Sequence, residues 1–248
     1  MILNFFLRFS TAMGQSLFVS GSHAALGSDD VTKAMPLQYF NNEFWQTQVE
    51  LSDDSLTPID IQYRYILKSQ DGSQVIEWGD DRLIDLTTHV VKEYTLIDTW
   101  NHAGDVQNAF FTKPFQEVFL KRKHATVKAK AVKTFTHEFK VKAPLLQKNE
   151  TLCIGGSAKQ FKNWDTGKTL PLIKAGNWFT IRLNLAKAVF PLTYKYGIYN
   201  ISNKKFIKFE EGNNRILLTE PARKTQTIIH DGFANLQNIN WKDRKSVV

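Results

Sequence analysis

The stretch Phe-Trp-Gln-Thr-Gln-Val-Glu-Leu, residues 44–51, alternates between large apolar and polar side chains. A side-chain period of two predicts a β-strand with one face against a core. Trp-Phe-Thr-Ile-Arg-Leu-Asn-Leu, residues 178–185, repeats this pattern. The separation is about 130 positions, and similarity at a fixed separation predicts a duplicated structural unit.

Three further pairs of short segments recur in the same order and at nearly the same separation. They are Gly21-Ser22 with Gly156-Ser157, Tyr63-Arg64-Tyr65 with Tyr194-Lys195-Tyr196, and Asp81-Arg82 with Asn214-Arg215. Asp71-Gly72 lies between two apolar runs, which is typical of a β-hairpin. We therefore expect an all-β fold with two immunoglobulin-like antiparallel β-sandwich modules in tandem. The expected boundaries are 1–98 for the first module, 99–130 for a connector, 131–229 for the second module, and 230–248 for a remainder.

The connector contains apolar residues that predict a short segment packed on one module. They are Val106, Ala109, Phe110, Phe115, Val118 and Phe119. Pro114 would interrupt a single long helix here.

Length and composition are sufficient for two domains of this size. The chain has 248 residues, of which 42% are hydrophobic and 12% aromatic, so a packed core is expected. The net charge is +8, and much of it lies between Lys121 and Lys133. We interpret that segment as a solvated linker and strand edge rather than a nucleic-acid site, because no aromatic residue lies among its lysines to stack on bases.

Other features argue against a membrane protein and against secretion. No stretch approaches the roughly 20 apolar residues of a membrane span, and residues 2–9 are expected to form a first strand rather than a leader. Cys153 is the single cysteine, which favours a reducing cytoplasm. We expect no nucleic-acid or membrane partner.

The sequence also lacks the patterns of common catalytic and metal sites. Its six histidines show no metal-ligand spacing, and neighbouring acidic residues on an extended chain point to opposite sides. Cys153 lies in an apolar run and is expected to be buried rather than nucleophilic. We therefore expect no metal, no cofactor and no catalytic residue.

The repeated segments resemble the family-20 carbohydrate-binding module, the starch-binding domain. The matching positions include Gly21-Ser22, Leu26-Gly27 and Asp81-Arg82 in the first half, and Asn163-Trp164, Phe209-Glu210 and Asn214-Arg215 in the second. Two such modules in tandem resemble the N-terminal region of the 4-α-glucanotransferases of the disproportionating type. Trp241-Lys242 resembles the entrance to the catalytic barrel of that family, so the resemblance implies that residues 230–248 are a truncated entrance to a missing barrel. The chain alone is then expected to catalyse nothing.

The resemblance implies a carbohydrate-binding site in each module. In module two it falls on Trp164, Lys195, Phe209 and Asn214; in module one it falls on Trp78, Arg64 and Gln62. Asp29 stands where the first aromatic of module one is expected, so module two is expected to bind more tightly. The family's second site implies Met13 and Tyr39 in module one.

The expected ligand is an α-1,4-glucan such as starch, glycogen or a maltooligosaccharide. Aromatic side chains can stack on the apolar faces of the sugars, and a cation and an amide can bond their hydroxyls. The tyrosines of the repeated segments, together with Trp45, Trp100 and Trp178, are expected in the core. An alternative remains, in which the sandwiches bind a protein partner or only space domains.

Overall fold

The computed structural model describes residues 1–52, 60–86, 91–119, 127 and 134–236. Within these ranges the regular secondary structure is mostly β-strand, with a few short helical turns. The expected all-β class is confirmed. The basic segment around 121–133 and the residues from 237 onward lie outside the described residues.

Module one contains strands β1 to β9. Their bounds are β1 Ile2–Arg8, β2 Gln15–Gly21, β3 Met35–Pro36, β4 Gln38–Tyr39, β5 Phe44–Glu50, β6 Asp60–Ser69, β7 Gln74–Ile76, β8 Arg82–Asp85 and β9 Glu93–Thr99. Two 3-10 turns, η1 Ala24–Leu26 and η2 Val31–Lys33, follow β2. The Asp71-Gly72 hairpin joins β6 to β7 as expected, with the Gly72 amide donating to the Ser69 carbonyl at 3.0 Å.

Module two repeats this order with strands β10 to β18. Their bounds are β10 His137–Lys142, β11 Glu150–Gly156, β12 Leu170–Pro171, β13 Ile173–Ala175, β14 Trp178–Leu183, β15 Leu192–Asn200, β16 Lys205–Phe209, β17 Arg215–Leu217 and β18 Thr225–Phe233. Its 3-10 turns are η5 Lys159–Phe161 and η6 Thr166–Lys168. The two alternating stretches of the sequence form β5 and β14, which confirms the repeat. Because β18 continues to Phe233, the expected boundary at residue 229 falls inside a strand.

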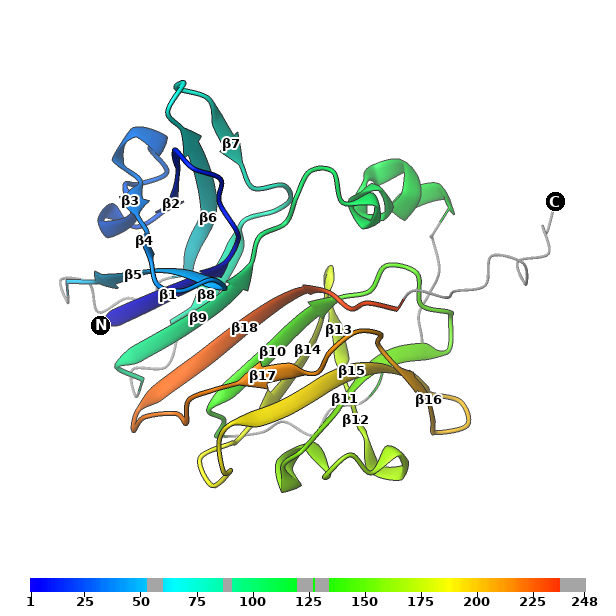
Figure 1. Ribbon diagram of the computed structural model, residues 1–248. Coiled ribbons are helices and arrows are strands. Elements are labelled where there is room, and N and C mark those ends of the chain that lie inside the picture. The colour runs from blue at the N-terminus through cyan, green and yellow to red at the C-terminus, as the bar shows by residue number, and fades with distance from the viewer. Residues whose placement is uncertain (53–59, 87–90, 120–126, 128–133, 237–248) are drawn as a thin grey trace.

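The two modules share one sheet. Its strand order is β13-β14-β10-β18-β9-β1-β5-β4, and the last strands of the two modules, β9 and β18, pair in parallel at its centre. Each module completes its sandwich with a smaller sheet, β3-β2-β6-β7 with β8 or β12-β11-β15-β16 with β17. In Figure 1 these smaller sheets lie on opposite sides of the shared sheet.

The central strand pair explains this arrangement. Leu96 and Ile228 stand opposite each other in register, and both belong to the core of module one. Their neighbours Ile97 and Ile229 point the other way and join the core of module two. Because alternate residues of a strand face opposite sides, each module contributes one face of its last strand to the core of the other.

Only some of the apolar residues of the connector pack as the sequence pattern predicts. It forms two short turns, η3 Val106–Phe111 and η4 Phe115–Phe119, and Val106 and Val118 are largely exposed. Phe110 does meet Phe115, with ring centroids 5.3 Å apart. Phe111, which the pattern omitted, contacts Phe233 of β18. None of the described helices is long and apolar enough to cross a membrane.

Candidate functional site

Trp164 of module two stands on a loop with an unusual backbone. Lys162, Asn163 and Trp164 all have positive φ, at 70°, 50° and 61°. Non-glycine residues rarely adopt this conformation, and where they do, surrounding contacts must hold it. Here Phe161 is buried beneath the loop, and the Trp164 amide donates to the Gly156 carbonyl at 2.8 Å. These contacts hold the half-buried indole close to strand β11.

Phe209, at the end of β16, forms the second aromatic face. Its ring lies over two glycines, and a Cβ added at Gly155 or at Gly197 would come within 3.2 Å of it. The Trp164 and Phe209 ring centroids are 5.7 Å apart, with their planes at 84°. Two nearly perpendicular aromatic faces, both half-buried, therefore meet over strands β11 and β15.

Two further residues of the expected site come from β15 and from the loop before β17. Lys195 on β15 pairs with Gly155 in register, and its ammonium donates to the Gly212 carbonyl at 2.6 Å. Asn214 is exposed just before β17. The next residue, Arg215, is fixed by two hydrogen bonds of 2.9 Å to Glu210. Trp164, Phe209 and Lys195 of the expected set thus lie together over β11 and β15, whereas Asn214 lines a groove between the modules.

Module one differs at both aromatic positions. Asp29 has the same positive φ, 63°, and the same amide bond to a strand carbonyl, at Gly21, 2.8 Å. It therefore occupies the place of Trp164. Ile66 and Gly197 are equivalent, because each directly follows the repeated tyrosine segment. Ile76 pairs with Ile66, and Phe209 pairs with Gly197. Ile76 therefore occupies the place of Phe209.

This register corrects the expected position of Trp78, which lies two residues beyond the place that corresponds to Phe209. Its amide donates to the Asn101 carbonyl at 3.2 Å, and the Asn101 side-chain amide donates back at 2.9 Å. Trp78 lines a groove between the modules. Arg64 instead binds Asp81 at 2.7 Å, and Gln62 lies opposite Leu83 on β8.

The residues of the expected second site are on the surface of module one. Met13 is fully exposed in the loop between β1 and β2, and Tyr39 is 60% exposed on β4. Tyr39 packs edge-on against Trp45 and donates to the Asn42 side chain at 2.7 Å. A function for this pair stays a prediction.

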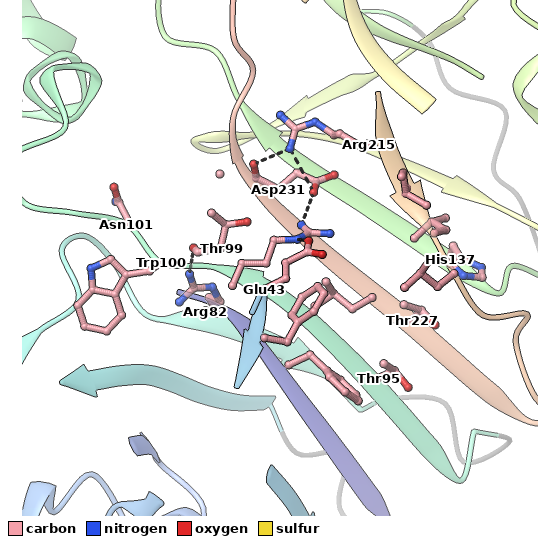
Figure 2. A pocket seen from close by; sticks show the side chains of 18 of the residues that line it. Glu43, Arg82, Thr95, Thr99, Trp100, Asn101, His137, Arg215, Thr227 and Asp231 are labelled. Atoms are coloured by element: carbon pink, nitrogen blue, oxygen red, sulfur yellow. Dashed lines mark hydrogen bonds and ion pairs between the residues drawn. The ribbon is translucent and has the colours of Figure 1, made fainter. Parts of the chain in front are cut away.

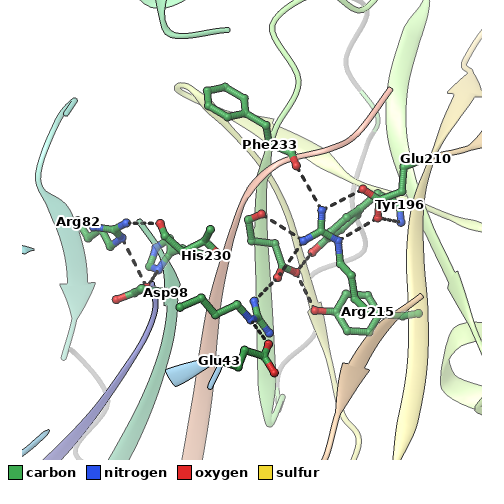
Figure 3. A network of polar contacts seen from close by, with 12 residues as sticks. Glu43, Arg82, Asp98, Tyr196, Glu210, Arg215, His230 and Phe233 are labelled. Atoms are coloured by element: carbon green, nitrogen blue, oxygen red, sulfur yellow. Dashed lines mark hydrogen bonds and ion pairs between the residues drawn. The ribbon is translucent and has the colours of Figure 1, made fainter. Parts of the chain in front are cut away.

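The repeated tyrosines lie in the core, as expected, and each pair shares one buried carboxylate. Figure 3 shows part of this network, with Asp98 of module one and Tyr196 of module two. Tyr63 and Tyr65 donate to Asp98 at 2.9 and 2.7 Å. Tyr194 and Tyr196 donate to Asp231 at 2.7 and 2.8 Å. The repeated tyrosines thus anchor each sandwich to its last strand.

The two carboxylates also join the modules. His230 of module two bonds Asp98 of module one at 2.6 Å, and Arg8 of module one bonds Asp231 of module two at 2.9 Å. Burial would raise the pKa of Asp98, but Arg82 and His230 lower it to about 2. Burial lowers the pKa of His230 to about 4, so it is a neutral donor near pH 7.

The arginines of the repeated segments are structural as well. Arg82 pairs with Glu77, and Arg215 pairs with Glu210, all of them buried or nearly so. Sequence reasoning missed both glutamates as partners. A glutamate five positions before the arginine in each half was the pattern that could have revealed them.

Chemistry of other kinds finds little support in the described part of the chain. Burial raises the pKa of Cys153 to about 12, so its thiol is not poised as a nucleophile. No group of three His, Cys, Asp or Glu side chains there could hold a metal ion.

Comparison with known families gives one match, which occurs twice. A family model described as the starch binding domain matches residues 1–95 and 134–229. These ranges cover most of the two sets of strands described above.

The individual proteins that resemble this chain share less than a third of its residues. The 4-alpha-glucanotransferase DPE2 of Oryza sativa subsp. japonica is 29% identical over 261 residues, which cover 97% of this chain and 26% of that protein. The chain thus spans about a quarter of that relative's length. Among solved structures, a glycoside hydrolase family 15 glucoamylase from Hypocrea jecorina is 27% identical, with a TM-score of 0.36, over 41% of this chain and 17% of that one. The family 20 module of a maltotetraose-forming amylase from Pseudomonas saccharophila STB07 is 15% identical, with a TM-score of 0.30, over 38% of this chain and 99% of that one.

Proposed function

The chain belongs to the starch-binding domain family, and from this premise we propose that it binds α-1,4-glucan, mainly through module two. The ligands are starch, glycogen and maltooligosaccharides. One observation carries the assignment to module two: Trp164 and Phe209 present nearly perpendicular rings 5.7 Å apart, with Lys195 beside them.

The chemistry of glucose suits this arrangement. Each sugar has apolar C–H faces, and successive residues of an α-1,4 chain turn relative to one another. Two angled rings can therefore each cover one sugar and remove apolar surface from water. Lys195 and Asn214 can bond the hydroxyls between the two faces. Such bonds contribute about 0.5–1.5 kcal/mol each but select the orientation of the chain.

Module one is the weaker binder in this proposal. Asp29 and Ile76 replace the two aromatic faces, and the Arg64 guanidinium is already paired with Asp81. Loss of one large stacking contact corresponds to roughly 1–3 kcal/mol, or about tenfold to a hundredfold in affinity.

A pull-down on insoluble starch tests the proposal. We expect the wild-type chain to be retained and Trp164→Ala to be largely lost from the pellet. Asp29→Ala changes the equivalent backbone position of module one and is the matched control; we expect it to bind like wild type. A wild-type chain that stays in the supernatant would contradict glucan binding and favour a role in protein contacts or spacing.

We further place these modules in a 4-α-glucanotransferase. Support comes from the alignment with the rice enzyme, which extends over 97% of the chain. In such an enzyme the modules would raise the local concentration of a long glucan near the catalytic site. Maltose disproportionation by the product of the native gene tests this placement, and a gene product without any glucan transfer would refute it.

The proposed compartment is the cytoplasm, where starch-active enzymes of this kind would meet soluble glucan. The buried free thiol of Cys153 is compatible with a reducing environment. Cell fractionation with an antibody against the chain tests this, and recovery from the medium would contradict it.

A further inference from the structure

A groove of about 1,020 Å³ runs along the junction of the two modules. Figure 2 shows part of its wall, with Thr95 and Thr227 on the two central strands, Glu43 of module one and Arg215 of module two. At one end, beyond the last residues of β9 and β18, the groove lining includes two partly exposed tryptophans, in addition to the buried Trp100. Trp78 comes from module one and Trp178 from module two, and each is half-buried.

Trp178 was expected in the core, and the structure corrects this. It stands at the start of β14 on the outer face of the module two sheet, with its ring centroid 5.1 Å from that of His230. The loop just before it meets module one, where the Asn177 side-chain amide lies 3.4 Å from the Asp80 carboxylate. Asp80 is itself two residues from Trp78, so a single interaction joins the loops that carry the two tryptophans.

Lys142 lies among aromatic rings at the same end of the groove. Its ammonium is 4.6 Å from the Trp178 ring centroid, 5.5 Å from Phe111 and 5.7 Å from Phe233. Burial, aided by Arg82 and opposed by Glu77 and Asp80, lowers the pKa of Lys142 to about 8. It is therefore still mainly cationic at pH 7.

Within the described part of the chain, the Lys142 ammonium contacts these rings and makes no hydrogen bond or ion pair. The repeat makes this informative, because Arg8 holds the corresponding position on β1 of module one. Arg8 is bound to Glu43 at 2.8 Å and to Asp231 at 2.9 Å. An ammonium can donate three hydrogen bonds. Lys142 can therefore donate to a ligand in the groove, whereas Arg8 already donates to two carboxylates.

The surrounding charges decide which ligand fits. Glu77 and Asp80 act on Lys142 from module one, so a phosphate or carboxylate would bring further negative charge beside two carboxylates. A neutral polyol avoids this repulsion, and its hydroxyls can both accept from Lys142 and donate to Asp80. Aromatic faces at Trp78 and Trp178 suit the apolar faces of sugar rings.

We propose that this end of the groove is a further binding site for a linear α-1,4-glucan, assembled from both modules. The ligand class rests on the proposed function, but the site is separate from that of module two. It brings together the same side-chain types as that site: two aromatic rings, a lysine and an asparagine. Trp78, Lys142 and Trp178 contact the sugar, and Asp80 and Asn177 exchange their long mutual bond for bonds to its hydroxyls.

Calorimetry with maltoheptaose on the complete chain tests the proposal. We expect wild type to bind at more than one site and Trp164→Ala to retain a weaker site. In the Trp164→Ala background, adding Trp78→Ala or Lys142→Met should weaken the remaining affinity at least about tenfold. Lys68→Met is the matched control, because Lys68 also lies over a ring, that of Phe18 at 4.4 Å, but outside the groove residues; it should change nothing.

Each outcome decides between the two proposals. If Trp164→Ala abolishes all binding, or if residual binding survives both Trp78→Ala and Lys142→Met, the groove site is refuted and glucan binding by module two stands. If wild type binds no maltoheptaose, both proposals fail. Thermal unfolding of each variant checks its fold, and if Lys142→Met does not fold, Trp78→Ala alone decides, since Trp78 lies at the surface of the groove.

Discussion

The two modules have nearly the same framework and very different surfaces at the candidate binding site. Both fix their paired tyrosines on one buried carboxylate, and both lock an arginine to a buried glutamate. At the candidate site, however, module two has Trp164 and Phe209 where module one has Asp29 and Ile76. The contacts that hold the sandwich are thus physically separate from the residues of the candidate site. After duplication one surface could change without loss of the fold.

The two modules also differ in the residues that lie beneath the second ring. In module two, Gly155 and Gly197 leave space that the Phe209 ring fills. In module one the same register positions hold Ser20 and Ile66, so a ring at position 76 would find that space occupied. Module one therefore lacks both the aromatic ring and the space beneath it that the ring would fill.

Removal of a shared carboxylate should have the largest effect, and it should be alike in the two modules. Asp231→Ala leaves two buried tyrosine hydroxyls without their acceptor and removes one of the two carboxylates bound by Arg8, and we expect a loss of about 3–5 kcal/mol in the free energy of unfolding. Asp98→Ala should cost a similar amount. Urea unfolding followed by circular dichroism measures both.

The same experiment shows whether the modules unfold together. Because β9 and β18 pair in one sheet, we expect a single transition in which both modules move together. Two transitions, with only one of them displaced by the substitution, would show that the modules are energetically independent. Asp81→Ala, which removes only a partly exposed pair with Arg64, is the control and should cost less than about 1 kcal/mol.

Acid should destabilise module two through a residue that module one lacks. His137 lies in the core position that Leu3 holds in module one, and burial lowers its pKa from 6.5 to about 4. The unfolded chain therefore takes up this proton first as the pH falls. The stability contributed by neutral His137 is complete above about pH 6.5 and is lost towards pH 4, with a change on the order of 3 kcal/mol.

His137→Leu, which restores the residue of module one, should remove this part of the pH dependence. Unfolding free energies at pH 7 and pH 4.5 for wild type and variant provide the measurement. An equal loss in both proteins would show that His137 does not titrate in this way.

Replacement of the second ring should weaken glucan binding by an intermediate amount. Phe209→Ile gives module two the residue that module one has at this place, and it leaves Trp164 as the remaining ring. We expect the Kd for β-cyclodextrin to rise about tenfold, since one aromatic stacking contact is lost. Ile76→Ala in module one is the control and should leave the Kd unchanged; a comparable loss there would mean that module one binds through a surface of its own.

A substitution at a glycine beneath the Phe209 ring should have the smallest effect on glucan affinity. Gly155→Ser adds a Cβ 3.2 Å from the Phe209 ring, so the ring must move by a few tenths of an ångström. We expect a rise in Kd of about two- to threefold. Ser20→Gly at the corresponding position of module one should have no effect. A wild-type Kd in Gly155→Ser would show that the position of the ring is not set by the residue beneath it.

The sequence was sufficient to predict the duplication and the strands, because alternation and repeated spacing are local properties. That Trp164, Phe209 and Lys195 of module two lie together was predicted through the family resemblance, while their role in binding stays a prediction. The place of Trp78 was not, because a shift of two residues in a hairpin is invisible until strand pairing fixes the register. The role of Trp178 and the link between Arg8 and Asp231 depend on how the modules meet, and a repeat within one chain does not specify that.

The central pairing of β9 with β18 also bears on how this tandem can be inherited. A half cut out alone would expose a parallel strand edge, which invites association with other chains. It would also lose the residue of the other half that meets its buried carboxylate, His230 for Asp98 or Arg8 for Asp231. Recombination that moves one half of this chain to a new gene would therefore destabilise that half, whereas transfer of both halves together would keep these contacts. The pair, rather than the single domain, is the unit on which selection can act.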